Sequence, residues 1–171
     1  MIKRIAITGP ESTGKSNLAK SLAFHYDAHV VPEFAREFLD ILNREYKEKD
    51  LLSIAKGQFE TEEKISKQAN EYLFVDTDFL VMKIWSLHKY GKCDPWIIDK
   101  FENHKYDLYL LCDIDLPWQP DPQREHPDIR QYLFDWYLKE LSNANLNYKI
   151  VSGTGEKRVE NAIKFVSNTF K

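Results

Sequence analysis

The feature that most constrains this chain is a glycine-bearing segment close to its start. Residues 9–16 read Gly-Pro-Glu-Ser-Thr-Gly-Lys-Ser, which fits the pattern G-x-x-x-x-G-K-S/T. The segment follows the apolar run Ile5–Thr8 and precedes leucines and alanines at helical spacing. A strand before this pattern and a helix after it form the context in which it binds phosphate. The segment therefore predicts a phosphate-binding loop between a buried strand and a helix.

The residue types of this loop suit that role. Glycine permits a tight wrap that points backbone N–H groups at phosphate oxygens, and the start of a helix adds a favourable dipole. Lys15 supplies a positive charge at the β- and γ-phosphates, and the Ser16 hydroxyl is a ligand for magnesium. We therefore expect ATP and Mg²⁺ as cofactors. The residues expected to bind the nucleotide are Gly9, Glu11, Ser12, Thr13, Gly14, Lys15, Ser16 and Asn17.

Strands and helices alternate along the rest of the chain. Short apolar runs typical of buried strands occur at 29–31, 72–75, 108–112 and 148–151. Helices are expected at about 16–26, 34–43, 51–69, 79–88, 94–103, 128–141 and 156–170, with a solvated turn at 45–50. This alternation predicts one α/β domain over residues 1–171. The expected fold is a P-loop NTPase of the nucleoside and nucleotide kinase type, a five-stranded parallel sheet with helices on both faces.

Charge and composition exclude several classes of protein. The net charge of -3 provides no strongly basic face for nucleic acid. The two cysteines, Cys93 and Cys112, are too few for a disulfide framework and lack metal spacing. No run approaches the roughly 18 apolar residues of a membrane span, and no secretory segment is visible. We expect a cytoplasmic protein with a small-molecule partner, without nucleic acid or membrane, and make no prediction of oligomeric state.

Acidic residues at the ends of predicted strands are the candidate metal ligands. In a parallel sheet these ends meet at the edge where ligands bind. Asp76 ends the third strand, and we expect it to hold Mg²⁺ together with Ser16. Asp78 would face the same way in a continuing strand, and is expected to contact the substrate or a metal-bound water. The alternative role for Asp78 is an N-cap of the next helix.

Glu33, directly after the second strand, is the candidate catalytic base. In phosphoryl transfer a base mainly orients the acceptor hydroxyl, because positioning and charge stabilisation carry most of the rate. Its alternative role is that of an acid favoured by a helix N-terminus. Arg36 lies three residues further on, on the same helical face, and is expected either to contact the substrate or to form a surface ion pair.

The proline-rich segment 116–127 is expected to form a lid-like loop. It contains four prolines and few apolar residues. Arg124 is a candidate catalytic group that would reach the phosphates on closure, since a guanidinium is permanently charged and bidentate. Its alternative role is that of a solvated loop arginine. Trp118 is an expected substrate contact, and Arg130 is expected to be solvated. Closure of such a lid would exclude water from ATP.

Four segments together resemble a known family: 9–16, 32–38, 74–79 and 117–124. In order and across nearly the whole chain they are similar to the NadR-like ribosylnicotinamide kinase module. The resemblance implies a kinase that transfers the γ-phosphate of ATP to the 5′-hydroxyl of nicotinamide riboside, giving nicotinamide mononucleotide for NAD synthesis. It also implies the roles proposed above for Lys15, Ser16, Glu33, Asp76 and Arg124. Multidomain relatives carry a nucleotidylyltransferase domain for which this chain has no room, so no adenylyltransferase activity is expected.

The sequence departs from the family at two positions, and two other functions stay open. Pro32 stands where an aromatic that can stack on the nicotinamide ring is common, and Pro122 replaces a glycine of the lid. Another riboside or small alcohol is therefore an alternative acceptor. A nucleoside monophosphate kinase would need a basic pocket that Arg36 alone barely supplies. A regulatory or partner-binding module that uses ATP as a switch is the alternative outside enzymes.

Overall fold

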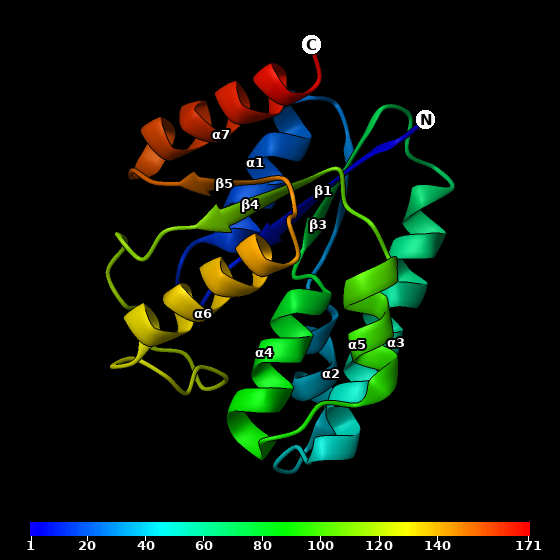
Figure 1. Ribbon diagram of the computed structural model, residues 1–171, viewed down its shortest axis with the longest axis vertical. Helices are drawn as coiled ribbons and strands as arrows, with labels where there is room; N and C mark the ends of the chain where they lie inside the picture. Colours follow the sequence, from blue (N-terminus) through cyan, green and yellow to red (C-terminus); the bar gives the residue numbers. More distant parts are fainter.

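Five parallel strands form a single sheet in the order β2-β3-β1-β4-β5 (Figure 1). The computed structural model describes residues 1–171. The strands are β1 (Lys3–Thr8), β2 (His29–Val31), β3 (Tyr72–Asp76), β4 (Leu108–Cys112) and β5 (Tyr148–Val151). Strand β1 lies between β3 and β4, so the connections that leave the neighbouring strands run to opposite sides of β1. In parallel sheets of this kind, ligands bind in the crevice at such a point, and the loop after β1 lies there.

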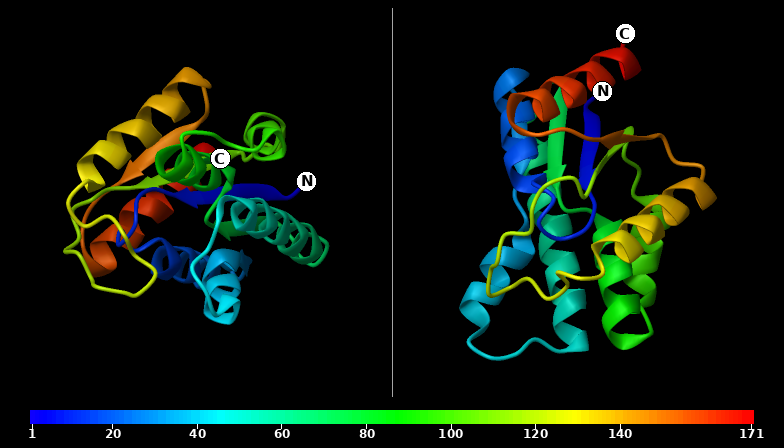
Figure 2. Two further views of the ribbon diagram at one scale, coloured as in Figure 1. Left: turned by 90° about the horizontal axis from the view of Figure 1, so that it is seen from below. Right: turned by 90° about the vertical axis from the view of Figure 1, so that its left-hand side faces the viewer.

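Helices cover both faces of this sheet (Figures 1 and 2). They are α1 (Lys15–His25), α2 (Phe34–Leu42), α3 (Glu48–Ser66), α4 (Phe79–Tyr90), α5 (Pro95–Asn103), α6 (Arg130–Asn143) and α7 (Gly155–Thr169). The predicted fold, a five-stranded parallel sheet with helices on both faces, is confirmed. None of the helices combines the length and the apolar composition that crossing a bilayer requires.

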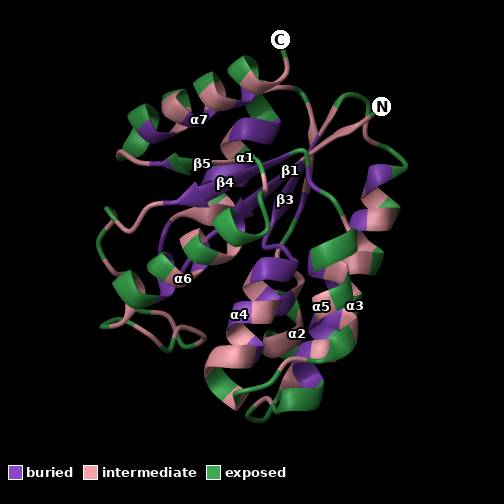
Figure 3. Ribbon diagram, viewed as in Figure 1, coloured by how far each residue is buried: buried purple, intermediate pink, exposed green.

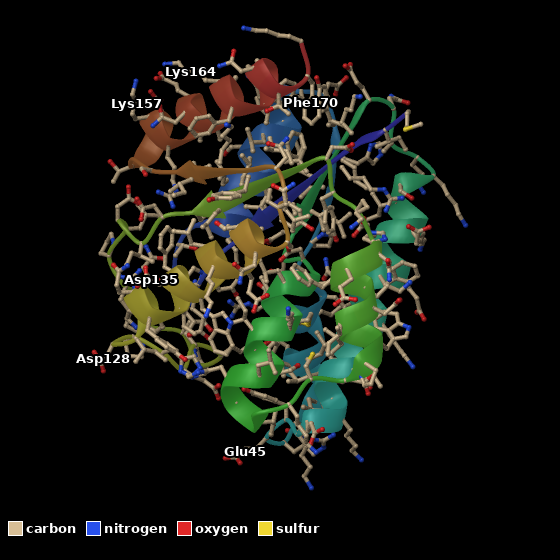
Figure 4. The ribbon with its side chains drawn as sticks, in the orientation of Figure 1. Glu45, Asp128, Asp135, Lys157, Lys164 and Phe170 are labelled. Carbon is tan, nitrogen blue, oxygen red and sulfur yellow. The ribbon has the colours of Figure 1, made fainter.

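Each face of the sheet has its own core, because successive side chains of a strand point to opposite faces. Ile5 and Ile7 of β1 pack with α1 and α7, whereas Ala6 belongs to the cluster formed with α4, α5 and α6. Figure 3 shows β1, β3 and β4 mostly buried between the two helical layers, whereas the edge strand β5 is partly exposed. On the outer side of α7, Lys157 and Lys164 project into solvent (Figure 4). The doubly covered sheet is thus the rigid base from which the strand-end residues project.

A third apolar cluster joins α2, α3, α4 and α5 beside the sheet. It contains Ala35, Leu51, Ile54, Ala55, Met82 and Ile97, all buried. This cluster fixes α2, which follows β2 and carries the predicted base at its start. The positions of α2 and α4 relative to the loop after β1 therefore depend on helix packing and not on the sheet alone.

Several predicted helix boundaries differ from the structure by two or three residues. Helix α3 begins at Glu48 instead of 51 and ends at Ser66 instead of about 69, and α6 begins at Arg130 instead of 128. The early start of α3 is explained by Asp50, whose carboxylate accepts the Lys47 N–H at 2.7 Å and pairs with Arg44. The expected solvated turn at 45–50 is therefore wrong in its second half, where Asp50 is buried and starts the helix.

Gly57→Ala is expected to destabilise the protein by about 1–3 kcal/mol through overpacking. Alanine is normally about 1 kcal/mol more favourable than glycine inside a helix. At this position, however, a Cβ would lie 2.1 Å from the Phe34 ring, because α3 and α2 are in close contact. Urea denaturation would measure the change. In a Phe34→Ala background the substitution should become neutral or stabilising, and an unchanged midpoint in the wild-type background would contradict the packing argument.

Candidate active site

A cavity of about 290 Å³ lies at the carboxyl ends of the strands. The loop after β1 forms one wall, and α2, α4, α6 and the segment 116–127 form the others. Of the predicted site residues, the cavity is lined by Gly9, Glu11, Ser12, Thr13, Gly14, Lys15, Ser16, Asn17, Glu33, Arg36 and Arg124. Asp76, Asp78 and Trp118 do not line it. The structure thus brings together groups predicted from three separate segments of the chain.

The loop between β1 and α1 has the tight wrap expected of a phosphate cradle. Gly9 has φ 131°, and a Cβ there would lie 3.0 Å from the Cys112 carbonyl oxygen of β4. Gly14, immediately before α1, has φ 76°. Both conformations favour glycine. The Lys15 ammonium donates to the Pro10 carbonyl at 2.7 Å, so this side chain lies across the loop and its charge faces the cavity.

Asp76 is a buried carboxylate next to this loop, at the end of β3. It is 4% exposed, and its Oδ1 has no hydrogen-bond partner. Burial, together with a smaller effect of the Glu33 carboxylate, raises the pKa of Asp76 to about 6, although the Ser16 hydroxyl and the Lys15 ammonium oppose the rise. An unpartnered oxygen beside a serine hydroxyl fits Mg²⁺, which takes one or two protein oxygens and completes its shell with phosphates and water. No group of three or more His, Cys, Asp or Glu side chains offers an all-protein metal site.

Asp78 has a different environment from Asp76. The intervening Thr77 has φ 73°, so the strand does not continue and the premise that both aspartates face the same way is wrong. Asp78 is fully buried at the N-cap of α4, where its Oδ1 accepts the Thr8 hydroxyl at 2.9 Å and the Val81 N–H at 3.2 Å. Its position matches the alternative role as a helix cap.

Glu33 and Arg36 both line the cavity from α2. Glu33 occupies the N-cap position, but its side chain makes no capping hydrogen bond, so the carboxylate is available to the cavity. The Arg36 guanidinium donates to Asp121 of the 116–127 segment at 2.7 Å, with both side chains partly exposed. Such an exposed ion pair adds little stability, yet it pairs the Arg36 guanidinium with a carboxylate. Arg36 therefore connects α2 to this segment.

The segment 116–127 contains neither helix nor strand and passes over the loop after β1 (Figure 2). The Gln119 N–H donates to the Ser12 hydroxyl at 2.8 Å. The Glu11 carboxylate accepts the N–H groups of Glu125 at 3.1 Å and His126 at 3.0 Å. Glu11, expected to bind the nucleotide, thus uses its carboxylate to hold the covering segment against the loop.

Arg130, at the start of α6, differs from its expected role, whereas Arg124 of the segment borders the cavity. Arg130 was expected to be solvated, but it donates to the carbonyls of Ser12 at 3.1 Å and Leu116 at 3.0 Å. Its guanidinium lies 5.7 Å from the centroid of the Trp118 ring. Arg124 lines the cavity and donates to the Gln119 carbonyl. Arg130 therefore ties the segment to the phosphate loop, while Arg124 is the arginine of this segment that borders the cavity.

Arg158 of α7 is a site residue that the sequence prediction missed. It is 4% exposed and donates to the carbonyls of Thr13 and Asp113, each at 2.9 Å. A second nitrogen pairs with Asp115 at 2.6 Å. These bonds connect the phosphate loop, at Thr13, to the segment that follows β4. No sequence signal marks this residue, since it is one of several charged residues in an amphipathic helix.

The part of the cavity away from the phosphate loop is largely apolar. Its hydrophobic lining consists of Ala35, Leu39, Val81, Ile84, Trp85, Leu133 and Tyr137, together with Leu116 and Pro117 of the covering segment. The Trp85 indole donates to the Tyr46 hydroxyl at 2.9 Å, and that hydroxyl donates to Glu125 at 2.8 Å. Lys89 also pairs with Glu125 at 2.7 Å. A cavity wall and the covering segment are thereby connected through Tyr46, which the sequence prediction also missed.

A phosphate loop after the central strand, a buried carboxylate on the neighbouring strand and a covering segment define a P-loop nucleotide-binding protein. The chain belongs to the AAA domain family, whose model matches residues 4–158.

Comparison with known proteins confirms the predicted resemblance to NadR. The chain is similar to the trifunctional NAD biosynthesis/regulator protein NadR, with 28% identity to the Escherichia coli protein and 26% to that of Salmonella typhimurium. Each match extends over 129 residues, which is 72% of this chain and 31% of the relative. The chain thus spans about a third of the length of these relatives.

Solved structures share the fold. NadR protein in complex with NR has a TM-score of 0.84 at 22% identity, over 98% of this chain and 51% of that one. NadR in complex with NAD and AMP-PNP has a TM-score of 0.79 at 23% identity, over 98% and 49%. A deoxyadenosine kinase from M. mycoides has a TM-score of 0.60 at 13% identity, over 96% and 99%.

Proposed function

We propose that this chain is an ATP-dependent small-molecule kinase whose acceptor is the 5′-hydroxyl of nicotinamide riboside, and that it acts in the cytoplasm. The observation that carries the proposal is one cavity lined by the phosphate loop with Lys15 and by the unengaged carboxylate of Glu33, with Asp76 buried beside it. The relatives named for NAD biosynthesis, and similar structures solved with NR or with AMP-PNP, support this choice of reaction and substrate.

Each site residue has a separate role in phosphoryl transfer. The loop amides and Lys15 hold the β- and γ-phosphates, and Arg124 approaches from the covering segment. Ser16 and Asp76 are the ligands for Mg²⁺, which neutralises phosphate charge when bound. Glu33 orients the acceptor hydroxyl and takes its proton as the new oxygen–phosphorus bond forms and the bond to the leaving ADP oxygen breaks.

The acceptor side of the cavity favours a riboside over a nucleotide. A monophosphate acceptor needs a free basic group, whereas Arg36 is paired with Asp121. In this proposal Lys15 and Arg124 contact the phosphates of ATP, so they do not supply that basic group. The apolar wall with Trp85 and Tyr137 suits a flat ring, and an aromatic face also attracts the positive charge of the nicotinamide ring in its riboside.

A panel of acceptors with labelled ATP tests the proposal. ADP release that depends on nicotinamide riboside, and exceeds that with other nucleosides and with nucleoside monophosphates, is the expected result. ATP binding without riboside-dependent ADP release would contradict the proposed kinase activity. It would favour the alternative function, a regulatory module that uses ATP as a switch. A preference for another nucleoside would keep the reaction class and correct the acceptor.

Glu33→Gln is expected to lower kcat about 100-fold, at the lower end of what a general base contributes. Glutamine keeps the shape of the side chain but does not accept the acceptor proton as a carboxylate does. Because the side chain makes no capping bond, the melting temperature and the affinity for ATP should change little. Initial rates at saturating substrates provide the measurement. Glu37→Gln, an exposed site on the same helix, is the matched control, and near-native turnover in Glu33→Gln would exclude Glu33 as the base.

A further inference from the structure

Gln58 connects the backbone next to Glu33 with that of Asp76, without lining the cavity itself. It belongs to α3 and is 1% exposed. Its Oε1 accepts the backbone N–H of Phe34 at 2.8 Å, and its Nε2 donates to the backbone carbonyl of Asp76 at 3.3 Å. A single side-chain amide therefore joins the first residue of α2 to the last residue of β3.

On the α2 side, this bond holds the backbone next to the candidate base. The first N–H groups of a helix have no partner within the helix. In α2, the N–H of Phe34 is satisfied by Gln58, while Glu33 at the N-cap position makes no side-chain capping bond. The backbone beside Glu33 is thus fixed by α3, and the Glu33 carboxylate stays available to the cavity.

On the β3 side, the bond holds the strand at the point where it ends. The Asp76 carbonyl accepts from Gln58, and its carboxylate Oδ1 is buried without a partner. The next residue, Thr77, has φ 73°, and its hydroxyl is also buried and unpartnered. The backbone therefore turns sharply after the carbonyl that Gln58 holds, so this bond fixes the last strand residue that carries the cation-facing carboxylate.

The preceding glycine explains how Gln58 reaches both partners. The position that a Cβ of Gly57 would take is occupied by the Phe34 ring, at 2.1 Å. The α3 backbone consequently lies directly against the start of α2. This close approach accompanies the placement of the Gln58 amide between Phe34 and Asp76.

We propose that Gln58 is a positioning residue for phosphoryl transfer, which sets the separation of the Glu33 carboxylate from the cation-facing end of β3. The inference rests on the proposed function, since it assigns Glu33 the role of base. Reacting atoms must come within about 3–3.5 Å, and a displacement of about 1 Å can cost about 100-fold in rate. Loss of the two hydrogen bonds of Gln58 thus affects the rate more than substrate binding.

Gln58→Met tests this role, because methionine has a similar length but neither hydrogen bond. The expected result is a kcat about 10- to 100-fold lower, with KM for ATP changed by no more than about twofold. Ile65→Val is the matched control on the same helix, since Ile65 packs on the core of the sheet, is not part of the cluster that fixes α2, and lies outside the cavity. The control should lower the melting temperature and leave kcat unchanged.

A double substitution separates positioning from general loss of structure. In a Glu33→Gln background the carboxylate that Gln58 positions is absent, so adding Gln58→Met should cost less than about threefold in kcat. A merely structural role would give the same factor in both backgrounds. Gln58→Glu keeps an acceptor for the Phe34 N–H, and its kcat should lie between those of the wild type and Gln58→Met. This variant also serves if Gln58→Met does not fold.

The outcomes distinguish this inference from the proposed function. A wild-type chain without riboside-dependent ADP release would overturn both. Normal wild-type release with near-native kcat in Gln58→Met, or in Gln58→Glu where only that variant folds, would overturn the role of Gln58 alone. Equal losses with and without Glu33 would also overturn it.

Discussion

Lys15→Ala is expected to lower kcat for phosphoryl transfer about 1000-fold, the largest loss of activity among the substitutions considered. Lys15 is the only lysine that lines the cavity, and its ammonium lies within the phosphate loop, 2.7 Å from the Pro10 carbonyl. Charge that develops on the transferring phosphoryl group is stabilised by a fixed cation in a site that excludes water. Initial rates of ADP release at saturating ATP and riboside measure the effect.

The fold should survive this substitution, because Lys15 contributes one hydrogen bond and no core contact. Lys20→Ala, an exposed site on the same helix, is the matched control and should retain wild-type rate and melting temperature. A Lys15→Ala protein that keeps more than about a tenth of the wild-type rate, with an unchanged fold, would show that the loop does not carry the reaction.

The parts of the site that the sequence predicted are those determined by local chemistry. The phosphate loop is recognisable because Gly9 and Gly14 adopt positive φ values at fixed offsets from Lys15. Glu33 and Asp76 could be proposed because each lies at the carboxyl end of an apolar strand, and parallel strands end at one edge of a sheet. These inferences need only strand direction and residue type, and the structure places Glu33 in the cavity and Asp76 beside it.

The parts that were missed depend on partners distant in sequence. Arg158 lies 145 residues from Thr13, whose carbonyl it holds, and Gln58 lies 24 residues from Phe34. The contact of Glu11 with the 116–127 segment spans 115 residues. Asp78 was misread for a local reason: alternation along a strand predicts its direction only while the strand continues, and Thr77 ends it. A side chain whose role is to hold another backbone segment has no pattern of its own.

Asp76→Asn is expected to stabilise the nucleotide-free protein by about 3 kcal/mol near pH 7, in contrast to most changes at buried sites. Burial raises the pKa of Asp76 from 3.8 to about 6, so near neutral pH the folded protein carries a desolvated charge that the unfolded chain holds in water. Asparagine has no charge to desolvate. Urea denaturation of both proteins across pH measures the difference.

The pH dependence follows from the raised pKa. Between about pH 4 and pH 6 the folded wild type binds more protons at Asp76 than the unfolded chain, so this site makes stability fall as pH rises through that window. The advantage of Asp76→Asn should therefore be near zero at about pH 4, grow through this window, and be complete above about pH 6. Asp128→Asn, an exposed site, should show no such trend. A constant difference at all pH values would contradict the charge argument.

The same substitution should remove the stabilisation that Mg²⁺ adds to nucleotide binding. A ligand at 100 times its Kd stabilises a protein by about 2.7 kcal/mol, and we expect the magnesium-dependent part of this shift to require the Asp76 carboxylate in the wild type. Thermal shifts with ATP, with and without Mg²⁺, should therefore differ in the wild type and coincide in Asp76→Asn. If the variant is more stable without nucleotide yet keeps the full magnesium effect, Asp76 is a buried acid and not the metal ligand. Loss of the effect together with the gain in stability would show that the wild type retains a destabilising charge because binding the cation requires it.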